Sequence, residues 1–162
     1  MTLSEQMRMR IEKIDSLIDK GYSLKIFNLQ GLKFPKLISP KGKIVSVIRG
    51  KYGDDQLAGF SWIAFLFPFA VATQIRHWSY FWMLGILCFV LDFIIAIPFN
   101  LDSSNAITVG ISFFYAYYFP YQRWLFSKSN KKEIGVAKSI FLGLLLSIIA
   151  NLPSIFLHAV YT

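Results

Sequence analysis

Asp92 has the clearest potential for chemistry, because it is a lone acidic side chain in an apolar stretch. It is the one charged residue between Trp78 and Phe99. A carboxylate is costly to place in lipid, so such a residue should face protein or water and is a functional candidate by default. The chemistry open to it is the binding of a proton or a cation, or a hydrogen bond that joins two helices.

Asn151 and Ser112 are the polar residues that we expect to meet Asp92. Counting from the cytoplasmic end of each apolar segment places Asn151 at nearly the depth of Asp92, and antiparallel counting on the intervening segment reaches Ser112. We therefore predict an intramembrane polar cluster in which Asp92 hydrogen-bonds Asn151, with Ser112 as a further partner. Two interpretations stay open: a structural clasp between helices, or an ion or proton site.

Motifs for catalysis, metal binding and nucleotide binding are absent from the sequence. There is no HExxH, CxxC or G-x-S-x-G motif and no phosphate-binding loop. His77 and His158 should lie near opposite membrane faces, where they cannot share a metal. A lone histidine is able to ligate haem or chlorophyll, although interfacial histidines are commoner. We expect no catalytic or metal-binding residues and no enzyme activity, and the sequence leaves any cofactor unknown.

The composition is that of an integral membrane protein with a polar N-terminal region. The chain is 55% hydrophobic, and the apolar residues are concentrated after Phe60. We therefore divide it into a cytoplasmic region, residues 1–58, and a membrane domain, residues 59–162. The net charge of +8 suits the cytoplasmic face and anionic lipids better than nucleic acid.

The N-terminal region is predicted to be a small α+β structure. Residues 4–20 have the apolar spacing of an amphipathic helix. Residues 36–49 indicate a hairpin across the turn Pro40-Lys41-Gly42. An isolated hairpin is marginal in water, so we expect it to pack on the helix, on the membrane surface or on a partner. The mixed charges of the helix favour packing on protein over a lipid surface, and a loose position on its own domain is the alternative. These elements offer few large core side chains, so we do not expect an autonomous domain.

The membrane domain is predicted to be all-α, with three transmembrane helices. The spans are residues 78–99, 106–126 and 138–160, each close to the length that crosses a bilayer. Residues 60–75 are apolar but shorter, and Pro68 interrupts them. We therefore expect that segment to be interfacial or re-entrant rather than crossing.

The distribution of positive charge determines the predicted orientation. If residues 60–75 do not cross, all 17 Lys and Arg residues fall on one side. The positive-inside rule then places the N-terminus in the cytoplasm and the C-terminus on the opposite side of a bacterial-type inner or thylakoid membrane. Basic residues expected to contact anionic lipid are Lys128, Lys131 and Lys132.

A row of small residues on the last span is a candidate packing face. Ser139, Gly143 and Ser147 recur every four residues, a spacing that lets another helix approach closely. Ala106 and Gly110 form a shorter version on the preceding span. Packing within the chain and an oligomer interface are both compatible with this pattern.

The stretch from Phe60 to Pro68, FSWIAFLFP, followed by Arg76, resembles the opening of an uncharacterised family of small bacterial inner-membrane proteins. Members of that family show an aromatic N-W-x-A-F-x-F-x-P-type run, a basic residue and a long hydrophobic helix. Ser61 replaces the usual Asn, and the Trp often seen after the proline is missing. The resemblance covers residues 59–145 and implies membrane class and topology, with no activity to carry over.

Two functions are compatible with these features. The first is a small multi-pass accessory or scaffolding subunit of a larger membrane protein complex, in contact with membrane lipids and other membrane subunits. The second is a homo-oligomeric channel, transporter or lipid-handling protein, in which Asp92, Asn151 and the broken segment 60–75 line a path. Stoichiometric foreign subunits after mild purification favour the first, and a symmetric homo-oligomer favours the second.

Overall fold

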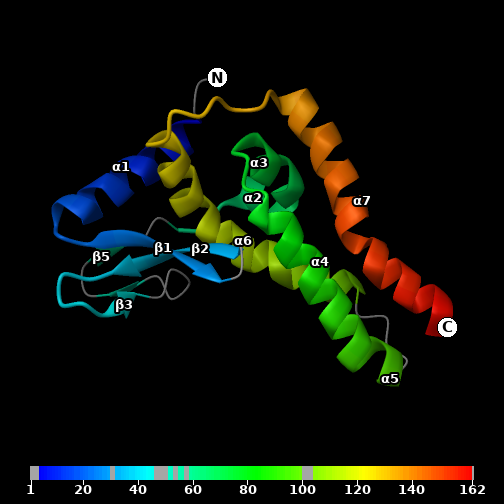
Figure 1. The fold of residues 1–162 in the computed structure, drawn as a ribbon. Coiled ribbons are helices and arrows are strands. Elements are labelled where there is room, and N and C mark those ends of the chain that lie inside the picture. The colour runs from blue at the N-terminus through cyan, green and yellow to red at the C-terminus, as the bar shows by residue number, and fades with distance from the viewer. Residues whose placement is uncertain are drawn as a thin grey trace. The chain divides into compact units, whose positions relative to one another are not determined.

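A computed structural model of the chain describes residues 4–29, 32–45, 51–52, 55–56, 59–99 and 104–161 (Figure 1). The chain divides into two compact units. Unit 1 comprises Met1–Ala64 and Phe114–Lys132, and unit 2 comprises Phe65–Phe113 and Glu133–Thr162. This division differs from the predicted boundary after residue 58, because the second half of one helix, α6 (Ser104–Ser127), belongs with the N-terminal region.

Unit 1 begins with α1 (Glu5–Asp19), which lies in the range predicted for an amphipathic helix. The Ser4 side chain caps its start by accepting a hydrogen bond from the Met7 N–H. Gly21 ends it with a φ of 85°, and the Tyr22 N–H donates to the Leu17 carbonyl at 3.1 Å. This is the Schellman arrangement, in which glycine adopts the left-handed conformation without steric cost.

The sheet of unit 1 has the order β1-β2-β3 and is antiparallel. Its strands are β1 (Ser23–Leu29), β2 (Leu32–Ile38) and β3 (Ile44–Val45). The predicted hairpin over residues 36–49 corresponds to β2 and β3, whereas β1 was not anticipated; residues 46–49 lie outside the described residues. A second, two-stranded sheet pairs β4 (Lys51–Tyr52) with β5 (Asp55–Gln56).

The core of unit 1 forms where α1, the three-stranded sheet and α6 meet. It consists of Ile14, Leu17, Leu37, Val45 and Tyr121. Each of these side chains is at most 2% exposed. The amphipathic face of α1 thus packs on residues of its own chain, and the tyrosine of α6 completes that core.

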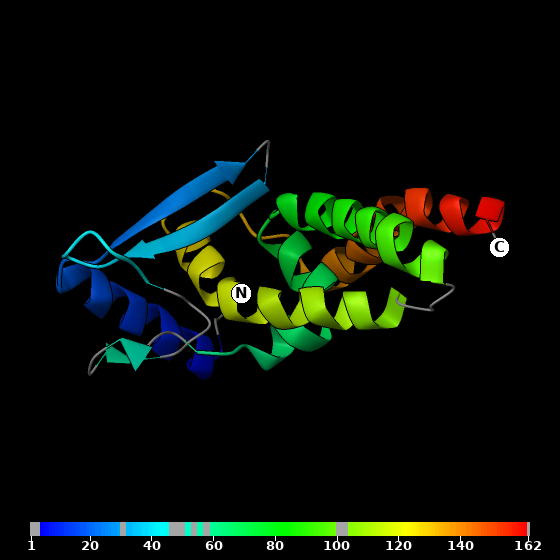
Figure 2. The same ribbon diagram turned by 90° about the horizontal axis from the view of Figure 1, so that it is seen from below.

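Unit 2 is helical. Its elements are α2 (Trp62–Leu66, which begins in unit 1), α3 (Pro68–Gln74), α4 (Ser79–Leu91), a π-helical turn η1 (Asp92–Ala96), α5 (Ile97–Phe99), the first half of α6, and α7 (Val136–Tyr161). Helix α7 packs on both α3 and α4. Figures 1 and 2 show α4 and α7 side by side, running in the same direction.

A loop contact positions the start of α7 beside α3. The Ile134 N–H donates to the Gln74 carbonyl at 3.1 Å, and the Gln74 side chain donates to Glu133. Helix α3 itself ends at Gln74, and Arg76, two residues later, has a φ of 54°. The Arg76 N–H bonds the Thr73 carbonyl and the His77 N–H bonds the Ala72 carbonyl, which is again the Schellman arrangement.

The prediction of three transmembrane helices is wrong. Among the described residues, α7 is the one helix long and apolar enough to cross a membrane by length and composition. The segment predicted over residues 78–99 has an apolar helical part of only Ser79–Ile95 among the described residues, and this part already includes most of the π-helical turn that follows Leu91. This falls short of the roughly 20 residues that a crossing requires.

The segment predicted to span over residues 106–126 fails for a different reason. Helix α6 is long enough, but its second half is rich in tyrosine and carries Gln122 and Arg123, which are both buried. Tyr121 lies in the core of unit 1. In residues 60–75 the helix breaks at Phe67, before Pro68, and neither α2 nor α3 approaches the length of a crossing.

Candidate functional site: the Asp92 cluster of unit 2

Asp92 lies where α4 changes into the π-helical turn η1. Proline at position 98 accounts for this change, because its ring clashes with the carbonyl one turn earlier and it has no N–H to donate. A wider turn relieves that clash, and such single π turns are common at functional sites. The Asp92 side chain is only 1% exposed, so it points into unit 2 rather than outward.

Two side chains of α7 contact the Asp92 carboxylate. The Ser154 hydroxyl donates a hydrogen bond to Oδ2, and Nε2 of His158 lies 3.6 Å from Oδ1. Ser154 is buried and His158 is about one-third exposed. Because the two residues are four positions apart on a helix, they lie on the same face. The carboxylate therefore joins the end of α4 to the last turns of α7.

The structure gives the predicted partners of Asp92 other roles. The Asn151 amide donates to the Ser147 carbonyl at 2.8 Å within α7. The Ser112 hydroxyl donates to the Thr108 carbonyl at 2.8 Å within α6. Of the three residues in the predicted cluster, only Asp92 takes part in the cluster that the structure forms.

The register of α4 against α7 explains why Asp92 meets Ser154 and His158. A Cβ added to Gly85 would lie 2.6 Å from the carbonyl oxygen of Ala150, so these two residues are directly opposed. Asp92 is two turns beyond Gly85, and its partners are one to two turns beyond Ala150. Counting depth from the ends of apolar stretches missed this register. The four-residue spacing of Ser154 and His158 was the sequence signal that could have identified them as partners of Asp92.

The cluster combines a carboxylate, a hydroxyl and an imidazole without forming a catalytic triad. In a triad the hydroxyl donates to the imidazole, which is oriented by the carboxylate. Here Ser154 and His158 each contact Asp92 directly. In the part of the chain that the structure describes, no group of three or more His, Cys, Asp or Glu side chains could hold a metal ion. The arrangement can join two helices or exchange a proton.

The small-residue face of α7 packs inside the chain. Ser139 and Gly143 are buried. A Cβ on Gly143 would lie 2.7 Å from the carbonyl oxygen of Phe69 and 3.0 Å from the hydroxyl of Thr73. The face formed by Ser139, Gly143 and Ser147 is thus where α3 approaches α7, which corresponds to the intramolecular interpretation. Ala106 is exposed, and a Cβ on Gly110 meets no atom within 4 Å.

The basic residues proposed to contact lipid differ in their surroundings. Lys128 Nζ lies 3.0 Å from Oδ1 of Asp15 and 5.4 Å from the centre of the Trp124 ring. The Trp124 indole N–H donates to the same carboxylate at 2.8 Å. These contacts tie α1 to α6 within unit 1. Lys131 and Lys132 are exposed in the loop that follows α6.

Two of these contacts shift the titration of Asp15. The hydrogen bond from Trp124 lowers the pKa of Asp15 below its usual range, partial burial opposes this, and Lys128 lowers the pKa further. The carboxylate is therefore charged at neutral pH and binds both the Trp124 side chain of α6 and the side chain of Lys128, which directly follows that helix.

Comparison with protein-family models, with curated proteins and with solved structures finds no match. The resemblance of the Phe60–Pro68 stretch to an uncharacterised inner-membrane family stays a prediction. The function of the chain must therefore be argued from its own geometry.

Proposed function

We propose that the protein is an accessory or scaffolding subunit of a larger membrane protein complex, anchored by α7. The observation that carries this proposal is the exposure of α7: it has 26 residues, and few residues of its apolar window are buried within the chain. At about 1.5 Å per residue it reaches about 39 Å, which exceeds a hydrocarbon core of about 30 Å. A surface of this kind needs lipid or other apolar helices around it.

Charge supports one orientation for this anchor. All 17 Lys and Arg residues lie at or before Lys138, in the first turn of α7. The positive-inside rule therefore favours a cytoplasmic N-terminal side and a C-terminus across the membrane, in a bacterial-type inner or thylakoid membrane. Lys131 and Lys132, just before the anchor, suit contact with anionic lipid headgroups.

The remaining exposed apolar surface supports a role as a subunit. Large side chains beyond α7 are also exposed, among them Trp82 and Phe99 at 69% each and Phe93 at 56%. A single anchor does not require them. They provide additional area for lipids and for helices of partner subunits.

A pair of charge substitutions in α7 tests the anchor. Ile148 and Val160 are each 59% exposed, but Ile148 lies at the middle of α7 and Val160 near its end. Arginine at the centre of a span costs about 2.5–3.5 kcal/mol, whereas near an end its side chain reaches the interface. We expect Ile148→Arg to reduce the carbonate-resistant membrane fraction strongly and Val160→Arg to leave it near wild type. Equal behaviour of the two variants contradicts a spanning α7.

Purification of the full chain from membranes in mild detergent tests the subunit role. We expect membrane proteins of other sequence to co-purify in fixed stoichiometry. A symmetric homo-oligomer without foreign subunits contradicts the accessory role.

The Asp92 cluster favours a second candidate function, a homo-oligomeric channel or transporter. A buried carboxylate with a hydroxyl and a partly exposed imidazole is suited to carry a proton. Under this function Asp92→Asn, which keeps the size and a hydrogen-bonding oxygen, abolishes proton flux in liposomes while assembly is unchanged. If the cluster is a structural clasp, Asp92→Asn lowers the yield of assembled protein and no flux is present to lose.

A further inference from the structure

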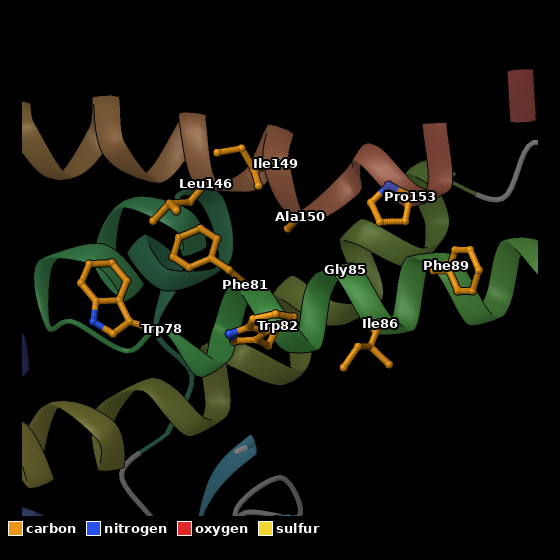
Figure 3. Close-up of a pocket in the computed structure, with 10 residues that line it drawn as sticks. All are labelled: Trp78, Phe81, Trp82, Gly85, Ile86, Phe89, Leu146, Ile149, Ala150 and Pro153. Atoms are coloured by element: carbon orange, nitrogen blue, oxygen red, sulfur yellow. The ribbon is translucent and has the colours of Figure 1, made fainter. Parts of the chain in front are cut away.

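An apolar groove lies between α4 and α7 in unit 2. Its volume is about 560 Å³, within the range of about 300–1,000 Å³ that is usual for small-molecule sites. Figure 3 shows its lining side chains, with Trp78, Phe81 and Trp82 toward the start of α4 and Phe89 and Pro153 toward the far end. The lining is aromatic and aliphatic, so the groove suits a hydrocarbon rather than a polar ligand.

Close contact between the two helices forms the base of this groove. Gly85 and Ala150 both line it, and a Cβ on Gly85 would lie 2.6 Å from the Ala150 carbonyl oxygen. Because neither residue has a large side chain, the backbones come close together here, and the larger lining side chains lie to either side of this contact.

The dimensions of the groove fit one acyl chain. From Trp78 to Phe89 the helix advances about 16 Å, close to the depth of one leaflet, which is about 15 Å. The lining residues along this length are aromatic, aliphatic or small, which suits a flexible hydrocarbon chain as long as one leaflet is deep.

Arg76 is close in the chain to Trp78, which lines one end of the groove. Arg76 is exposed and precedes Trp78 by two residues, so their Cα atoms are at most about 7 Å apart. It occupies a left-handed position, with a φ of 54°, where glycine is the usual residue. Its guanidinium matches the geometry of a phosphate, and tryptophan side chains favour the level of the headgroups.

We propose that the groove between α4 and α7 binds one acyl chain of an anionic phospholipid, with its phosphate at Arg76. The assignment goes beyond the subunit role and does not require α7 to cross the bilayer. The Ile148→Arg and Val160→Arg pair tests the anchor, and lipid binding tests the groove, so the two can fail separately.

Substitution of neighbouring isoleucines provides a matched test. Ile149 lines the groove and Ile148 does not, and both are exposed on α7. The detergent-purified full chain is mixed with phosphatidylglycerol, and bound lipid is counted by native mass spectrometry. We expect one retained phosphatidylglycerol in the wild type and in Ile148→Trp. Ile149→Trp should bind it about fourfold more weakly for each methylene that the indole excludes.

A second pair on α4 protects the test against misfolding of one variant. Ile86 lines the groove, and its neighbour Leu87 does not. Ile86→Trp should weaken lipid binding as Ile149→Trp does, whereas Leu87→Trp should not. For the headgroup, Arg76→Gln should remove the preference for phosphatidylglycerol over phosphatidylcholine while retaining a bound chain.

Three results would overturn the assignment. The first is wild-type lipid affinity in both Ile149→Trp and Ile86→Trp. The second is lipid adduction that rises with lipid concentration without a one-to-one limit, which indicates only a surrounding lipid shell. The third is unchanged lipid binding together with loss of a co-purifying membrane protein from the groove-filling variants, which would identify a protein as the occupant.

Discussion

Unit 1 and unit 2 differ in where they place apolar side chains. In unit 1 Ile14 and Leu37 are fully buried, and the core is closed by a helix, a sheet and a tyrosine. In unit 2 large apolar side chains face outward, with Phe141 at 72% exposure and Trp82 at 69%. Unit 1 thus has a closed core of its own, whereas unit 2 leaves many large apolar side chains of α4 and α7 exposed, which is compatible with membrane association.

The polar residues show the same contrast. Of the 17 Lys and Arg residues, all except Arg76 and Lys138 belong to unit 1. The buried polar side chains of unit 2 are Thr73, Asp92, Ser112, Ser139 and Ser154. In unit 2 the close helix contacts are made by small residues such as Gly85 and Gly143, and buried hydroxyls donate within their own helix or to Asp92. One short chain therefore combines two ways of packing.

Truncation of a large apolar side chain should give the largest difference in stability loss between the two units. Leu37→Ala leaves a cavity in the core of unit 1 and should cost about 2–5 kcal/mol in the free energy of unfolding. Phe156→Ala removes a side chain that is mostly exposed in unit 2 and should change stability by about 0.5 kcal/mol or less. Hydrogen exchange of the detergent-solubilised chain, followed in α1 and α7, measures both. Equal losses of hydrogen-exchange protection in the two variants would contradict this difference between the units.

Removal of a hydroxyl tests the polar interior of unit 2. Ser154→Ala takes a hydrogen bond from a buried carboxylate, which should cost about 1.5–3 kcal/mol. Ser127→Ala is the control, because that hydroxyl is exposed and bonds the carbonyl of Trp124 in its own helix. We expect the exchange rate of α7 amides to rise in the first variant alone. No difference between the two would mean that the Asp92 contact does not stabilise unit 2.

Addition of one methyl group tests close packing in unit 2. Gly143→Ala places a Cβ against the backbone of Phe69, so α3 and α7 must separate at a cost of about 1–3 kcal/mol. Gly110→Ala meets open space and should stabilise its helix by up to about 1 kcal/mol. The midpoint temperature of thermal unfolding in detergent should therefore fall in Gly143→Ala and rise in Gly110→Ala. Shifts in the same direction would show that α3 and α7 do not depend on this glycine.

The smallest effect is expected at the surface of unit 1. Asp15→Asn weakens the contact with Lys128 and should cost about 1 kcal/mol or less, because the pair is partly exposed. The pKa of Asp15 is below its ordinary value of 3.8, so its contribution is complete above about pH 4 and is lost as pH falls through the lowered pKa. The stability difference between wild type and Asp15→Asn should shrink in that acidic range. A difference that is constant down to pH 2 would exclude this linkage.

Local signals in the sequence were sufficient to predict some elements of the fold. The apolar spacing of residues 4–20 indicates a helix where α1 lies, and Pro68 indicates a break where α2 ends and α3 begins. Each of these features depends on neighbours in the chain. The lone carboxylate of Asp92 was likewise identifiable, because a single charge in an apolar stretch is conspicuous.

Contacts between distant segments determine what the sequence could not show. Helix α6 has the length of a membrane span, and only its packing on α1 shows that Tyr121 belongs to a core. The partners of Asp92 depend on the register of α4 against α7, which Gly85 and Ala150 set by direct backbone contact. Neither the packing of α6 on α1 nor the register of α4 against α7 can be predicted from the residues of one segment alone.

The π-helical turn at Asp92–Ala96 has a consequence for the end of its helix. A π turn holds one more residue than an ordinary turn closed over the same height. Deleting one residue there would therefore restore regular winding and leave Phe99 on nearly the same side of the axis. A deletion in the regular part of α4 would instead rotate every later residue, Asp92 included, by about 100° around the axis. The π turn is thus a position where the chain can change length without redirecting the apolar side chains beyond it.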